Sequence, residues 1–113
     1  MAIIRQDFDE LESGGLEFSQ THVVGGSLSA SSSLSVTNCP FKPLLIVVRV
    51  QNSNGDNIGS NVDSNGNISE DTLYFYDKNG SSYTTMSITI TNTGFTGGVW
   101  SGYSRDYICM LFG

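Results

Sequence analysis

Apolar and polar residues alternate with a period of two along most of this chain. The clearest run covers residues 83–91, in which Met86, Ile88 and Ile90 share one face and threonines dominate the other. A second run, residues 27–36, alternates serines with apolar residues over most of its length. The apolar residues of that run are Leu28, Ala30, Leu34 and Val36. Such alternation predicts strands with one face against a core and the other in water.

The remaining apolar runs are short, and turn sequences separate them. Residues 44–50 are apolar on both faces as far as Arg49, which predicts a central strand covered on both sides. Asn54-Gly55, Asn65-Gly66 and Asn79-Gly80 favour tight turns. Seven or eight short strands of this kind predict an all-β domain, an antiparallel β-sandwich of jelly-roll-like architecture.

The last seven residues, 107–113, form a dense apolar segment that ends without a polar tail. Chain ends are usually polar and frayed, and an exposed apolar strand is prone to aggregate. We therefore expect this segment to lie inside the sheet or under another subunit.

The first fifteen residues differ from the rest, so we treat residues 1–15 and 16–113 as separate units. Ile4, Phe8 and Leu11 are spaced as on one face of a short helix, which residues 13–15 (Ser-Gly-Gly) would end. An extended arm is the alternative, since residues 2–5 also suit a strand. The segment is acidic, and we expect it either to pack on the sandwich or to dock onto a neighbouring subunit.

Composition and charge exclude several partners. Charged residues make up 14% of the chain and the net charge is −6. Five scattered basic residues cannot form the positive stripe that nucleic-acid phosphates require, and the acidity disfavours an anionic membrane surface. The longest apolar run, residues 44–48, is too short to span a bilayer. No signal-peptide pattern follows Met1, so we expect a soluble protein made in the cytoplasm that leaves it only within a particle.

Residues suited to catalysis are scarce. Cys39 and Cys109 are expected to be buried thiols rather than a disulfide, because no secretion signal is present. With His22, the only histidine, they are too few for a closed zinc site. His22 lies on a probable strand with no nucleophile elbow, so we expect a structural role. The acidic residues show no spacing that singles out a catalytic pair, so we predict a non-enzymatic protein without a cofactor.

The polar stretch 51–71 suggests a hairpin with an extended tip, and it invites comparison with a calcium loop. Asp63, Asn65 and Asn67 alternate as ligands would. The EF-hand pattern, however, needs glycine at its sixth position and glutamate at its twelfth, where this chain has Ile68 and Tyr74. We therefore predict a solvated loop and no metal.

An aromatic cluster near the end of the chain supplies the candidate binding residues. Tyrosine and tryptophan present an apolar ring with a polar tip, which suits recognition of sugars or proteins. The candidates for a glycan or protein partner are Trp100, Tyr103, Arg105, Asp106 and Tyr76.

Three short motifs give the chain a family resemblance. Phe41-Lys42-Pro43, Gly94-Phe95-Thr96 and the terminal strand from Tyr107-Ile108 occur in this order. Over residues 41–113 the chain resembles the C-terminal modules of bacteriophage tail fibres and minor structural proteins. It departs from them at Cys109 and Met110, where small or β-branched residues are usual.

The resemblance implies a β-sandwich virion module, commonly a homotrimer, that helps a phage reach its host surface. The expected partners are other copies of the chain, other virion proteins and a host-surface glycan. The alternative is a small capsid decoration or head-fibre protein that acts through subunit contacts.

Overall fold

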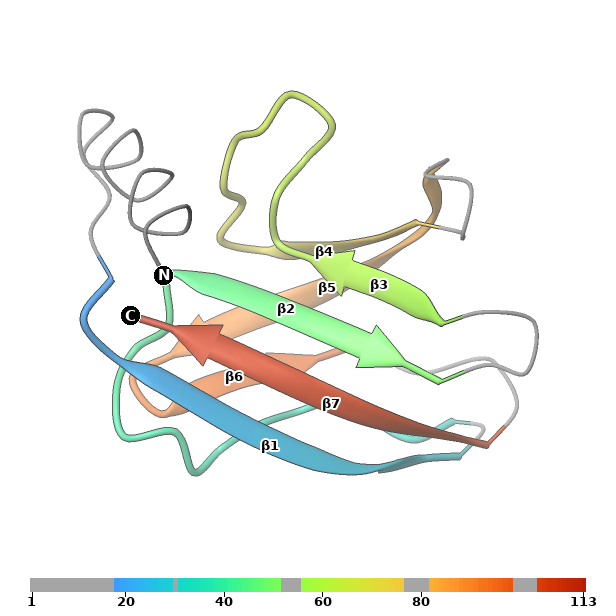
Figure 1. Ribbon diagram of the computed structural model, residues 1–113, viewed down its shortest axis with the longest axis horizontal. Coiled ribbons are helices and arrows are strands. Elements are labelled where there is room, and N and C mark those ends of the chain that lie inside the picture. The colour runs from blue at the N-terminus through green and yellow to red at the C-terminus, as the bar shows by residue number, and fades with distance from the viewer. Residues whose placement is uncertain (1–17, 30, 52–55, 77–81, 99–103) are drawn as a thin grey trace, which may run out of the picture.

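The computed structural model describes residues 18–29, 31–51, 56–76, 82–98 and 104–113, and all regular structure within these ranges is β (Figure 1). The strands are β1 (Thr21–Leu28), β2 (Leu45–Val50), β3 (Asn57–Ser60), β4 (Thr72–Tyr76), β5 (Ser82–Thr91), β6 (Gly94–Gly97) and β7 (Arg105–Phe112). The expected N-terminal helix or arm, residues 1–15, lies outside the described residues.

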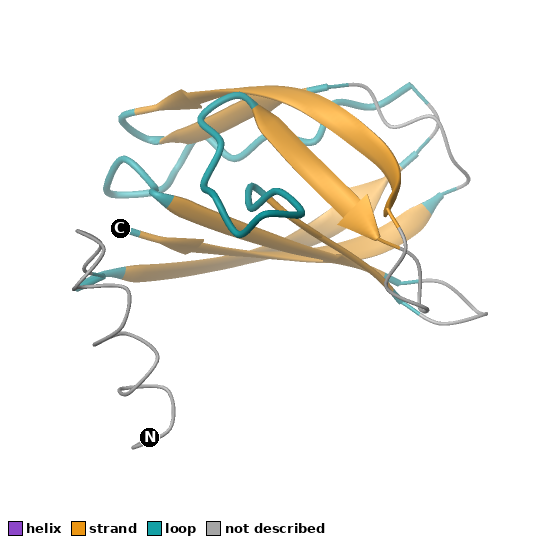
Figure 2. Ribbon diagram, turned by 90° about the horizontal axis from the view of Figure 1, so that it is seen from above, coloured by secondary structure: helices purple, strands orange, loops and turns teal. Residues whose placement is uncertain are grey.

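The seven strands form one antiparallel sheet in the order β1-β7-β2-β3-β4-β5-β6. The long strand β5 pairs with β4 through residues 82–87 and with β6 through residues 88–91, so it carries the sheet from one layer to the other. Seen from above, the strands lie in two layers (Figure 2). The predicted all-β antiparallel fold is confirmed, and its layers belong to one curled sheet.

The edge of the sheet at β6 is covered by the chain itself. The amide of Val36 donates to the carbonyl of Phe95 at 2.9 Å, and the amide of Phe95 donates back at 2.8 Å. Gly94 has φ +132° beside the Val36 carbonyl, where a side chain would collide with that oxygen. Within the described residues β1 pairs only with β7, which leaves the other edge of β1 open.

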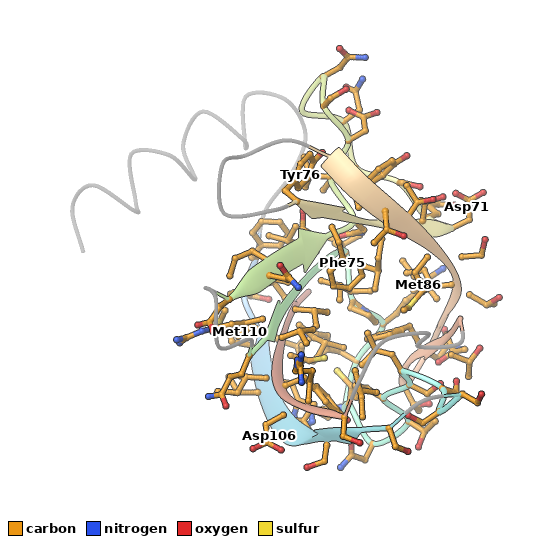
Figure 3. The ribbon with its side chains drawn as sticks, turned by 90° about the vertical axis from the view of Figure 1, so that its right-hand side faces the viewer. Asp71, Phe75, Tyr76, Met86, Asp106 and Met110 are labelled. Carbon is orange, nitrogen blue, oxygen red and sulfur yellow. The ribbon has the colours of Figure 1, made fainter. Side chains whose placement is uncertain are left out.

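The inward-facing residues of the strands meet in one apolar core, toward which Phe75 and Met86 point (Figure 3). Of the residues that alternation placed inside, Leu28, Leu34, Val36, Met86 and Ile88 are buried, Ile90 is partly buried, and Ala30 lies outside the described residues. The other buried apolar residues are Cys39, Phe41, Ile46, Val48, Val50, Leu73, Phe75, Phe95, Cys109 and Leu111.

Both cysteines belong to this core as free thiols, which confirms the expectation of buried thiols. Burial raises the pKa of the Cys109 thiol to about 12, because the apolar surroundings disfavour the thiolate.

The apolar C-terminal segment forms β7, which lies between β1 and β2. Its expected position inside the sheet is confirmed. The amide of Gly113 donates to the carbonyl of Gln20 at 3.0 Å, and the Gly113 oxygen accepts from the amides of Ser19 and Gln20. The final residue is therefore held by the segment that leads into β1.

The polar stretch 51–71 contains the short strand β3, so it is more than the expected hairpin tip. After β3, the fully buried Asn61 side chain accepts a hydrogen bond from the amide of Ile46 at 2.7 Å. It also donates to the carbonyls of Leu44 (2.9 Å) and Ser69 (3.0 Å). Asn61 thus ties the start of β2 to the following loop.

Candidate functional site

The outer face of β1, β7 and β2 is polar at one end. The antiparallel register places Ser27 opposite Asp106. On the other side of β7, the amide of Gln51 donates to the carbonyl of Asp106 at 2.9 Å, which continues the pairing just beyond β2. Three hydrogen-bonding residues from distant parts of the sequence thereby form one row across the sheet.

A shallow, open hollow of about 510 Å³ lies at this polar end. Its lining combines the end of β1, the residue after β2, the residue before β3 and the start of β7. The lining residues are Ser27, Leu28, Gln51, Asp56, Ser104, Arg105 and Asp106. Six of these seven residues have polar side chains, so the hollow suits a hydrogen-bonding ligand rather than an apolar one.

Hydrogen bonds already orient several of these side chains. The Ser27 hydroxyl donates to Oδ1 of Asp106 at 2.7 Å. Arg49, on the same outer face, donates through Nε to Oδ2 of Asp56 at 2.6 Å, and its Nη2 forms an ion pair with the same oxygen at 2.5 Å. Each oxygen of a carboxylate can accept more than one hydrogen bond, so Asp106 retains capacity for a ligand.

The structure brings together two of the five residues that the sequence singled out, Arg105 and Asp106. Tyr76 lies at the end of β4 opposite Ile58, and β2 and β3 separate it from β7, so it does not line the hollow. Tyr76 and Asp106 lie at opposite ends of the molecule in Figure 3. Trp100 and Tyr103 lie outside the described residues.

Sequence reasoning missed Ser27, Gln51 and Asp56. Ser27 and Asp106 are 79 residues apart, and only the pairing of β1 with β7 makes them neighbours. The alternation of residues 27–36 placed Ser27 on a polar face. Nothing in the nearby sequence, however, indicated that Ser27 would pair with Asp106.

Asp63 was considered as a metal ligand and His22 as a catalytic base, and the structure shows the surroundings of both side chains. The Oδ1 atom of Asp63 accepts hydrogen bonds from the amides of Asn65 and Asn67, both at 2.9 Å, so this carboxylate holds its own turn. His22 was expected to be a satisfied structural residue. Its Nε2 atom is instead buried without a hydrogen-bond partner in the described structure.

No helix in the described part of the chain is long and apolar enough to cross a membrane. No protein-family model matches the chain, and no curated protein or solved structure shows significant similarity to it. The function must therefore be argued from the geometry and from the residues themselves.

Proposed function

We propose that this protein is a non-enzymatic phage virion module that attaches to a host-surface glycan through the hollow between β1, β2 and β7. One observation carries the proposal: Arg105 and Asp106 line the same open hollow as Ser27 and Gln51. Arg105 and Asp106 were both candidate binding residues from the sequence. The same site also contains Asp56.

The chemistry of the hollow matches that of a sugar. Hydroxyl groups both donate and accept hydrogen bonds, and Asp, Gln, Arg and Ser side chains supply both partners. The Ser27–Asp106 hydrogen bond and the Arg49–Asp56 ion pair hold their carboxylates in place before a ligand arrives, which lowers the ordering cost of binding.

The motifs behind the phage resemblance occupy constrained positions, which supports a virion role. Phe41 is buried, and its ring lies against the position of the final residue, Gly113. Gly94 has the positive φ described above, and Phe95 is fully buried. These residues are therefore structural determinants of the sheet, as a family signature would require.

Glycan-array binding of the purified full chain tests the proposal. We expect binding to a defined glycan class and a loss of at least roughly tenfold, about 1.4 kcal/mol, in Asp106→Ala. Glu70→Ala removes the same charge from an exposed site outside the hollow and should bind normally. Trp100→Ala tests the aromatic candidate that lies outside the described residues. Absence of glycan binding, or full binding by Asp106→Ala, would overturn the proposal.

A small capsid decoration or head-fibre protein is the second candidate, and the open edge of β1 favours it. The eight residues of β1 contain no Lys, Arg, Asp, Glu or Pro, and their register with β7 is continuous. Such an unprotected edge can accept a strand from another subunit.

Light scattering and particle incorporation test this second function. We expect a homotrimer of the 12.2 kDa chain. Thr21→Lys, at the exposed edge, should reduce trimer formation and incorporation into particles, whereas Thr84→Lys on β5 should not. A monodisperse monomer at high concentration would contradict the assembly role.

A further inference from the structure

Beside the polar row, the outer face of the sheet is apolar. Ile46, Val48 and Val50 of β2 are buried on the inner face, whereas Leu45 and Val47 on the outer face are only partly buried. The sequence of β2 predicts a strand covered on both sides, and the described residues cover the outer side incompletely. Within the described residues, the outer side of β2 is therefore only partly covered.

The apolar side chains on this outer side are contiguous across four strands. Val23, Met110 and Val47 lie in one row, and Ile108, Arg49 and Ile58 lie in the next. We define the outer apolar face as Val23, Leu45, Val47, Ile58, Ile108, Met110 and Phe112. Val23 is 60%, Ile58 45% and Ile108 41% exposed, so large apolar side chains face water on three of these four strands.

The chain enters the sheet from this face. The ring of Phe18 packs against that of Phe112, with centroids 6.1 Å apart and a tilt of 51° between the rings. Phe112 belongs to the outer apolar face, and Phe18 directly follows the seventeen residues outside the described structure. The N-terminal segment therefore starts its path beside the surface that needs a cover.

We propose that residues 3–12 dock as an amphipathic helix on the outer apolar face of the same chain. Ile4, Phe8 and Leu11 form the apolar side of that helix, which faces the sheet. This cover is separate from glycan binding in the hollow, and neither proposal depends on the other.

The dimensions of the two partners match. A helix of ten residues is about 15 Å long. The four strands β1, β7, β2 and β3 span about 14 Å at the usual strand spacing. Residues 13–17 can reach up to about 17 Å when extended, and Gly14-Gly15 allows the chain to reverse direction. The helix can therefore lie over the face immediately in front of Phe18.

The charge of the outer apolar face is compatible with this occupant. Among the outward residues of β1 to β4 and of residues 108–112 in β7, Arg49 is the single charged side chain. Its side chain is 52% exposed. The docked segment carries an excess of negative charge on its polar side and flanks. Its acidic residues are Asp7, Asp9, Glu10 and Glu12. Arg49 is already paired with Asp56, so the apolar part of the face is close to neutral and does not repel an acidic helix.

The short connection favours the same chain over a second copy. Five linking residues hold the segment near its own face at an effective concentration in the millimolar range. A neighbouring copy reaches that concentration only within an oligomer or an assembled particle. In the free protein, we expect each chain to cover its own face.

Cysteine pairing in the full-length protein tests the docking. In the variant Phe8→Cys/Ile108→Cys, mild oxidation should form a disulfide within one chain, detected by peptide mapping. Asp9→Cys/Ile108→Cys is the matched control, because position 9 is turned about 100° from position 8, onto the polar side of the helix, and it should react much more slowly. The native Cys39 and Cys109 are buried and should not interfere.

Mixing isotopically labelled and unlabelled chains distinguishes the two sources of the helix. Disulfides confined to like-labelled peptides confirm docking within one chain, and mixed disulfides would overturn it. Equal rates for the Phe8 and Asp9 variants would also overturn it. As an independent check, Phe8→Asp/Leu11→Asp should raise the fluorescence of an added apolar dye several-fold while the far-ultraviolet β signal persists. Unchanged dye fluorescence would contradict the proposal.

Discussion

The ring of Phe75 lies directly over Gly59, its partner on the neighbouring strand. A Cβ atom built on Gly59 would lie 2.6 Å from the ring carbons Cδ1 and Cε1, well inside van der Waals contact. Tyr107 covers Gly26 in the same way on β1, at the edge of the sheet. In both pairs an aromatic side chain fills the space that a glycine leaves on the inner face.

Gly59→Ala should destabilise the protein because Phe75 would have to leave the site that its ring fills in the core. We expect a loss of about 1–3 kcal/mol in the free energy of unfolding, typical of overpacking a core. Urea denaturation measures it. Gly25→Ala is the control, since a Cβ there meets only the Tyr107 carbonyl at 3.3 Å and Ile108 at 3.9 Å. Equal losses in the two variants would refute this account of Gly59.

Asn61→Ala should be among the most destabilising single changes. It removes one buried and two partly buried hydrogen bonds and leaves the amide of Ile46 and the carbonyls of Leu44 and Ser69 without this partner. We expect a loss of roughly 2–4 kcal/mol in unfolding free energy, measured by chemical denaturation. Asn67→Ala, on the exposed loop, should change stability by less than about 0.5 kcal/mol. A loss in Asn61→Ala no larger than that would show that the side chain is dispensable.

Stability should fall at alkaline pH because of Cys109. An unfolded cysteine ionises near pH ~8.5, whereas burial raises the Cys109 pKa to about 12. Between these values the unfolded chain loses a proton that the folded chain keeps, so unfolding becomes easier as pH rises. The slope is at most about 1.4 kcal/mol per pH unit. Denaturation curves from pH 8 to 11, compared with Cys109→Ala, measure it, and identical slopes would contradict the assignment.

A charged peptide added directly after Gly113 should disturb the protein and its assembly more than the same peptide before Met1. Gly113 exchanges backbone hydrogen bonds with Gln20, and the ring of Phe41 occupies the space beside its Cα. Loss of about 1 kcal/mol there would lower Tm by roughly 4–8 °C. Thermal unfolding and particle incorporation of the two tagged proteins decide the matter, and a harmless C-terminal tag would contradict the expectation.

The alternation of apolar and polar residues predicted strands whose buried face can be recognised in the local sequence. It was less informative where a strand's partner lies far away in the sequence. Residues 82–91 form one long strand, which includes the expected run 83–91. Residues 34–36 belong to none of the seven strands, and Val36 makes an isolated bridge to Phe95. Ser31, with φ 68°, lies between that segment and β1. Strand β3 was hidden in a polar stretch because its packing depends on Gly59 lying under Phe75.

The candidate site was predictable only in part for the same reason. Arg105 and Asp106 follow the aromatic cluster in the sequence and could be found there. Ser27, Gln51 and Asp56 become their neighbours through the register of β7 with its two flanking strands and the turn toward β3. Register over such sequence separations depends on the whole sheet, which a single sequence does not disclose.

The position of β7 has a consequence for how the protein is made. β7 is the last strand in the sequence, yet it lies between β1 and β2 and joins them. During synthesis, those two strands must wait for residues 105–112 to leave the ribosome before they can be connected. The protein should therefore fold after this segment emerges, and slowly, since its central pairings span up to about ninety residues. Until then, the apolar strands β1 and β2 would be exposed, which makes them natural targets for chaperones.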